Sequence, residues 1–164
     1  MKTLIMGVGL CAVMTAAMGQ MPKYGVTVTA DKKVDFAAFK TYSWTVGQPS
    51  AVKAIDSQVI AAVDRELHVL GLIKAESGPG DVLATYYSLT RTDVNVNAKP
   101  DSNGQFPQYW VGTLIVALLD PTDHRRLLRL RVDQPIEIDP AKLEASIDSA
   151  VAALFAKYPT RHRK

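Results

Sequence analysis

Two segments with apolar residues at helical spacing constrain the fold most strongly, because each has one face that must be buried. In residues 52–70, apolar side chains recur three and four positions apart, at Ile55, Val59, Ala62, Val63, Leu67 and Leu70. In residues 140–158 the corresponding stripe consists of Leu143, Ile147, Val151, Leu154 and Tyr158. Asp139 and Pro140 are typical of a helix start, and Pro159 is typical of a helix end. Gly71 is typical of a C-terminal helix cap in the left-handed backbone conformation. Both stripes need an apolar surface to cover, which the rest of the chain must supply.

Alternating patterns predict that this surface is a sheet. Residues 24–30 and 42–46 alternate in polarity, and the long segments 81–97, 108–119 and 128–132 are rich in apolar and β-branched residues. A polar loop at 97–107 and an Asp-Pro turn at 120–123 separate the long segments. The order strand, strand, helix, three-strand meander and helix predicts an α+β fold. We expect a mostly antiparallel sheet of about four to five strands with two helices packed on one face.

The densest aromatic stretch, residues 34–46, also points inward. Phe36 and Phe39 follow the N-cap Asp35 at the spacing of one helical turn, and Tyr42 and Trp44 then fall on one side of a short strand. A surface platform for a sugar, lipid or peptide is the alternative interpretation. Alternation into one face favours packing in the core, where aromatic side chains contribute most.

Residues 1–19 have the pattern of a signal peptide that is removed on export. Lys2 gives a positive start, an apolar run follows, and Ala17 and Gly19 are the small residues that signal peptidase needs. The run is shorter than the roughly 20 residues of a membrane-spanning helix, and no later segment is long and apolar enough to span. We therefore expect an exported, periplasmic bacterial protein with no transmembrane span. Residues 20–158 would form a single α+β domain, followed by a basic C-terminal tail at 159–164.

The single cysteine, Cys11, lies within this predicted signal peptide. Leu10 precedes it, where a lipoprotein signal needs a small residue, so lipoprotein anchoring is not expected. The mature chain then has no cysteine, which removes disulfides, thiolate catalysis and cysteine-ligated metals. Its stability must come from the core alone.

The residues that most often carry chemistry do not form a recognisable constellation. None of the three histidines has a partner at metal-ligand spacing, and no Gly-x-Ser-x-Gly motif is present. Asp81, Asp120 and Asp123 are interpreted as turn-forming residues rather than as paired catalytic carboxylates. We expect no catalytic residues, no metal, no cofactor and no enzymatic activity. The formal net charge of +3 is too small to indicate nucleic-acid binding.

Two sets of residues remain as candidates for binding. The aromatic candidates for a ligand site are Tyr86, Tyr87, Tyr109 and Trp110. Because Tyr86 and Tyr87 point to opposite faces of their strand, at most one of them is buried behind the helices. The candidates for contact with an anionic surface are Arg129, Arg131, Arg161, Arg163 and Lys164. For the tail residues, a solvated and frayed terminus is the favoured alternative.

Several blocks of the sequence resemble the bacterial family known as domain of unknown function 4136 (DUF4136). They are "VDFAAFKTYSW", "IDSQVIAAVDRELHVLGL", "GDVLATYYS", "GTLIVALLDP" and "AVAALFAKYP", in the family's order. The resemblance implies a secreted or lipid-anchored envelope protein of α+β type with no established activity, and it supplies no catalytic residues. The chain departs from the family after the Asp-Pro turn, where residues 128–131 replace the usual Trp and Gly. The poor lipidation site is a second departure.

These observations favour a non-enzymatic binding or interaction module of the cell envelope. It would act through an open sheet face or an edge strand on an envelope protein or a lipid. The alternative is a carrier that holds an apolar small molecule or lipid between the sheet and the helices. A hydrolase is the least favoured reading, because it requires a pocket that gathers at least two of His68, Asp81, Asp120 and His124.

Overall fold

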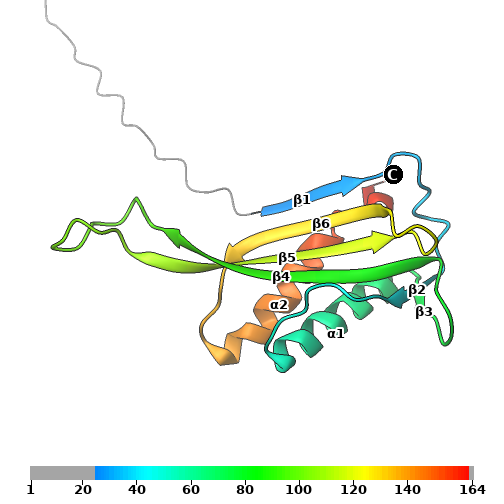
Figure 1. Ribbon diagram of the computed structural model, residues 1–164, viewed down its shortest axis with the longest axis horizontal. Coiled ribbons are helices and arrows are strands. Elements are labelled where there is room, and N and C mark those ends of the chain that lie inside the picture. Colours follow the sequence, from blue (N-terminus) through cyan, green and yellow to red (C-terminus); the bar gives the residue numbers. More distant parts are fainter. Residues whose placement is uncertain (1–24, 163–164) are drawn as a thin grey trace, which may run out of the picture.

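The computed structural model describes residues 25–162, and the predicted signal peptide lies outside them. The elements follow one another along the chain as shown in Figure 1. They are β1 (Gly25–Ala30), β2 (Thr41–Trp44), α1 (Lys53–Val69), β3 (Ile73–Lys74), β4 (Val82–Val94), β5 (Gln108–Leu119), β6 (Arg126–Pro135), α2 (Pro140–Phe155) and the 3-10 helix η1 (Pro159–His162). Within residues 25–162, neither helix has the length and hydropathy that crossing a membrane requires.

One sheet of six strands, in the order β1-β6-β5-β4-β2-β3, carries both helices on the same face (Figure 1). The α+β class and the two helices on one face were predicted, but the strand number and direction were not. β1, β6, β5 and β4 are antiparallel neighbours, whereas β2 runs parallel to both β4 and β3. The sheet is therefore mixed. β3 has only two residues, too few for any alternation to be visible in the sequence.

The caps at the end of α1 and at the start of α2 are those that the sequence suggests, with one difference in where α2 ends. Gly71 adopts a φ of +89° directly after α1, as a left-handed cap requires. The Asp139 carboxylate accepts the backbone N–H of Ala141 at 3.0 Å and caps α2. The difference lies at the end of α2, which stops at Phe155 rather than at Tyr158. A tighter turn follows, in which the N–H of Tyr158 donates to the carbonyl of Phe155.

The core lies between the sheet and the helices and includes the aromatic stretch, as predicted. Phe36 and Tyr42 are buried, and Phe36 meets the ring of Tyr158 edge to face at 5.8 Å. Trp44 is half-buried and packs edge to face on Tyr86. The polar groups of the two aromatic residues of β2, Tyr42 and Trp44, form hydrogen bonds with helix α1. Its Asp64 carboxylate accepts the Tyr42 hydroxyl at 2.7 Å and the Trp44 indole N–H at 2.8 Å.

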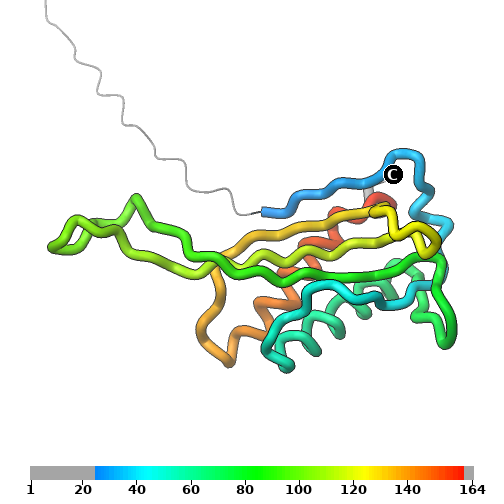
Figure 2. Tube along the Cα trace, in the orientation of Figure 1, coloured from blue at the N-terminus to red at the C-terminus, as the bar shows by residue number. Residues whose placement is uncertain are grey.

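A long hairpin extends from the body of the molecule. β4 and β5 pair along their whole length, and in Figures 1 and 2 their far halves continue past both helices. Only part of this hairpin is covered by other elements, so apolar side chains on it reach solvent. The exposed ones are Leu89, Val94, Val96, Phe106 and Trp110. We call residues 89–111, which include the connecting loop, the arm.

Candidate functional site

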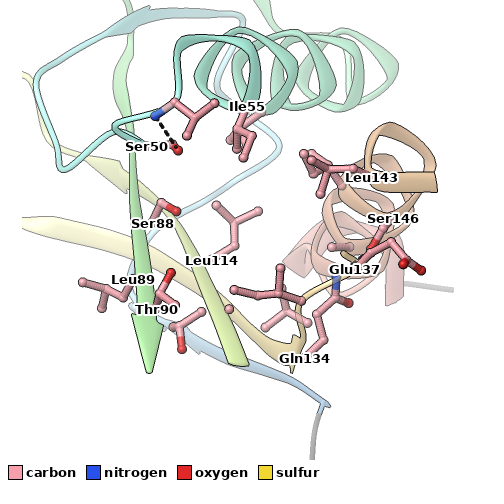
Figure 3. A pocket seen from close by; sticks show the side chains of 18 of the residues that line it. Ser50, Ile55, Ser88, Leu89, Thr90, Leu114, Gln134, Glu137, Leu143 and Ser146 are labelled. Atoms are coloured by element: carbon pink, nitrogen blue, oxygen red, sulfur yellow. Dashed lines mark hydrogen bonds between the residues drawn. The ribbon is translucent and has the colours of Figure 1, made fainter. Parts of the chain in front are cut away.

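A pocket of about 490 Å³ opens between the sheet and the first turns of both helices. Aliphatic side chains line it from several elements, and Figure 3 shows Ile55 of α1, Leu143 of α2 and Leu114 of β5 around the central space. Val59, Val132 and Ile147 extend the same lining. The apolar stripes of the two helices therefore do not close fully on the sheet at this end.

The pocket forms where two connecting segments leave the sheet. Residues 48–52 run from the β2 edge to the start of α1, and residues 134–137 run from β6 to the start of α2. Gln48 is held to the sheet by two backbone hydrogen bonds, of 3.0 Å to Tyr86 and 2.9 Å from Ser88. Opposite, the Ile136 N–H donates to the Trp110 carbonyl at 3.0 Å. Both walls are thus fixed to the sheet by their backbones.

A few polar groups interrupt the apolar lining. They belong to Gln48, Ser50, Ser88, Thr90, Thr113, Gln134, Glu137 and Ser146. The Gln134 side-chain amide donates to the Ser146 hydroxyl at 3.2 Å, which joins β6 to α2 across the pocket (Figure 3). A mainly aliphatic pocket with a few convergent polar groups is the usual composition of a small-molecule site.

Tyr86, predicted as a possible ligand contact, supports a wall of the pocket instead of lining it. Its side chain is only 4% exposed. Its hydroxyl donates to the Asp56 carboxylate of α1 and accepts the N–H of Ser50 at 3.1 Å. Burial, and then the Asp56 hydrogen bond, raise the pKa of Tyr86 to about 12. The neutral phenol therefore ties β4, the 48–52 segment and α1 together.

The other aromatic candidates do not converge on the pocket either. Tyr87 is half-buried and, by strand alternation, lies on the sheet face away from the helices. Tyr109 and Trp110 lie on the arm, and the Trp110 side chain is 59% exposed. Tyr86 and Tyr87 do differ in burial, in agreement with their predicted opposite orientation. None of the four lines the pocket.

Of the basic residues predicted to contact an anionic surface, Arg131 on β6 has a carboxylate partner. Arg131 donates through Nε and Nη2 to both oxygens of Asp133, each at 2.8 Å. Asp133 also accepts Arg91 Nη1 at 2.8 Å and the Thr113 hydroxyl at 2.6 Å. Arg129 is half-buried on the same strand. The Arg161 side chain, Arg163 and Lys164 lie outside what the structure describes.

The Asp133 network gives a pH prediction. The Arg131 guanidinium holds the pKa of Asp133 well below its usual range, with help from Thr113 and Arg91. A lowered folded-state pKa contributes stability above the unfolded value of about 4, and this is lost as the pH falls toward the folded value. Asp133→Asn should therefore cost about 2 kcal/mol at pH 7. Urea unfolding at a series of pH values should show that the difference in the free energy of unfolding between the wild type and Asp133→Asn shrinks below about pH 4. Glu76→Gln, in an exposed loop, is the control, and a pH-independent difference would contradict the prediction.

The carboxylates and histidines considered for hydrolysis are distributed over separate elements. The Asp81 carboxylate accepts the N–H groups of Lys40 and Thr41, at 2.8 and 2.9 Å, so it fixes the start of β2. Asp120 accepts the Thr122 N–H at 2.8 Å within the β5–β6 turn, which also contains His124. His68 belongs to the last turn of α1. None of these residues lines the pocket. Over residues 25–162, no three His, Cys, Asp or Glu side chains gather in a way that could hold a metal ion.

Comparison with known sequences and structures places this geometry among related folds. A sequence model of the family described as "Domain of unknown function (DUF4136)" matches residues 26–160. A PDZ domain protein from Parabacteroides distasonis ATCC 8503 superimposes with a TM-score of 0.56 at 18% identity. That match covers 86% of this chain but only 36% of the other, so this chain spans about a third of that protein.

A second solved structure, the PelC dodecamer from Paraburkholderia phytofirmans, also has a TM-score of 0.56. Its identity is 9%, with 87% of this chain and 100% of that chain covered. At such low identities the likeness to both structures concerns the fold alone. No curated protein matches the chain.

Proposed function

The chain belongs to the DUF4136 family, and we propose that it is a non-enzymatic binding module of the bacterial cell envelope. Its binding site is the pocket between the sheet and the first turns of α1 and α2, which takes up an apolar group. The observation that carries this proposal is the aliphatic lining of a pocket of about 490 Å³. The envelope location rests on the pattern of a signal peptide in residues 1–19.

The dimensions and construction of the pocket favour a ligand over a packing defect. Ligand pockets commonly measure about 300–1,000 Å³, whereas voids inside a close-packed core rarely exceed a few water molecules. Its walls are held by backbone hydrogen bonds to the sheet and by the Tyr86 hydroxyl. A preformed apolar site of this kind binds without a large ordering cost.

Filling the pocket should abolish binding and leave the fold intact. Leu114 projects into the central space in Figure 3, so Leu114→Trp occupies volume that a ligand would use. We expect the neutral fluorescent probe N-phenylnaphthylamine to bind the wild type saturably and Leu114→Trp at least about tenfold more weakly. Because the added ring enters empty space, the free energy of unfolding should change by no more than about 1 kcal/mol.

The matched control is Val69→Trp, which adds the same ring at a site that is 70% exposed, at the far end of α1. It should bind the probe like the wild type. Equal probe affinity in Leu114→Trp and the wild type would contradict the assignment of the pocket.

Self-association through the arm is a second function that a separate observation supports. Val94, Val96 and Trp110 expose apolar surface on a hairpin that the helices do not cover. Exposed aromatic side chains on such a projection are typical of protein interfaces. The PelC structure, which shares the fold, is described as a dodecamer. We propose a second copy of this chain as the partner of the arm.

Removing the largest exposed side chain of the arm should weaken this association. Trp110→Ser is expected to shift the mass measured by light scattering after size-exclusion chromatography from oligomer toward monomer. Val46→Ser, at a site that is 93% exposed outside the arm, should leave the mass unchanged. A wild-type protein that remains monomeric at about 100 μM would contradict self-association. Its dissociation constant would then be higher than specific protein interfaces usually have.

A further inference from the structure

We infer that the ligand of the pocket is a single aliphatic chain with an uncharged polar end, a hydroxyl or an amide. The inference rests on the proposed function, because it names the chemical class that the same site would bind. It follows from the lining side chains in three respects: their charge, their hydrogen-bonding groups and their lack of aromatic rings.

The charge of the lining excludes an anionic end. Among residues 25–162, no Lys, Arg or His lines the pocket, and Glu137 is the sole charged residue that does. The Glu137 carboxylate accepts the N–H of Asp139 at 2.9 Å at the rim. A carboxylate or phosphate entering beside it would lose water without gaining a cation and would meet a like charge.

Cationic side chains near this end of the molecule are engaged or lie elsewhere. Lys142, at the start of α2, pairs with Asp139 at 3.4 Å. Arg65 pairs with Asp148 at 2.6 Å, and neither residue lines the pocket. Lys53 begins α1 but is exposed and does not line the pocket. An anionic ligand therefore has no lining side chain to neutralise it.

The polar groups that do line the pocket suit a neutral partner. Ser88 and Ser146 carry hydroxyls that can donate or accept, and Gln134 carries an amide that can do both at once. The Gln134–Ser146 hydrogen bond of 3.2 Å places these two groups close enough to share one more oxygen or nitrogen. A hydroxyl or amide on the ligand would satisfy them without bringing a charge into an apolar space.

The lining also indicates the shape of the apolar part. In the part of the chain that the structure describes, no Phe, Tyr or Trp lines the pocket, so a sugar would have no aromatic face on which to stack. Ile55 of α1, Leu114 of β5, and Leu143 and Ile147 of α2 instead offer branched aliphatic surface. Such a surface favours a flexible hydrocarbon chain.

Competition between two ligands of equal chain length tests this class. With the purified chain at pH 8, dodecanol and dodecanoate are titrated against bound N-phenylnaphthylamine, dodecanol below its solubility limit and dodecanoate below its critical micelle concentration. Dodecanol should displace the probe at a concentration at least about tenfold lower than dodecanoate, because only the latter is charged. Glu137→Gln keeps an acceptor for the Asp139 N–H but removes the charge. It should therefore reduce the ratio of the dodecanoate to the dodecanol concentration that displaces the probe. Glu144→Gln, which removes the same charge from an exposed position of α2 outside the lining, should leave it unchanged.

The outcomes separate the inference from the function on which it rests. Equal displacement by both ligands, stronger displacement by dodecanoate, or displacement by neither would overturn the ligand class while the bound probe still supports the pocket. Absence of probe binding would overturn the proposed function itself. If Glu137→Gln leaves the ratio of the two displacing concentrations unchanged, the Glu137 carboxylate does not discriminate against an anionic ligand.

Discussion

Phe155→Ala is expected to lower the free energy of unfolding by about 3–5 kcal/mol, as for other fully buried aromatic side chains. Phe155 is 0% exposed in the last turn of α2 and stacks on Tyr158, with ring centroids 6.3 Å apart. Tyr158 in turn contacts Phe36, so the lost ring leaves a cavity where α2, its C-terminal turn and the segment before β2 meet. Equilibrium urea unfolding, followed by circular dichroism, measures the change.

Phe106→Ala is the matched control for this substitution. Phe106 lies in the loop of the arm and is 38% exposed, so its removal should cost less than about 1 kcal/mol. If the two variants lost similar stability, the core would not extend to the end of α2 as the structure shows.

Gly80→Ala is expected to have the second largest effect, a loss of about 3 kcal/mol. A Cβ atom at Gly80 would lie 2.6 Å from the Cα of Tyr42 and 2.7 Å from its backbone N and C atoms. These atoms belong to β2 and cannot move aside as the end of a flexible side chain could. The substitution must therefore push β2 away from β4, where Tyr42 pairs with Val82.

The displacement of β2 should also disturb the hydrogen bonds from Lys40 and Thr41 to the Asp81 carboxylate. Gly25→Ala is the control, because a Cβ there has no atom within 4 Å. It should leave the urea midpoint nearly unchanged. A Gly80→Ala protein as stable as Gly25→Ala would show that β2 and β4 do not approach so closely.

Elements whose own residues determine their conformation could be predicted from the sequence. The α1 stripe, the Gly71 cap, the Asp139 cap and the inward aromatics of 36–44 depend on local spacing and on burial, and both are visible in one chain. Strand β5 even has the predicted bounds, because polar turn residues flank a long apolar run on both sides.

Features that depend on distant partners could not be predicted. The parallel pairing of β2 requires knowledge of where α1 returns the chain, and the two residues of β3 carry no pattern. Ile55, Leu143 and Ile147 were recognised as helix stripe residues, but spacing cannot show that the sheet stands away from them at one end. Similarly, alternation placed Arg131 outward but could not show that it shares the Asp133 carboxylate with Arg91.

The pairing of β1 with β6 has a consequence for biogenesis. Gly25 lies opposite Asp133, so the strand that the ribosome makes first has to wait for the strand that it makes last. At about 5–20 residues per second, that delay is on the order of 5–20 s. During this interval β1 is a segment of high β-propensity without its partner strand. Chaperones bind such segments, and aggregates grow by pairing with them.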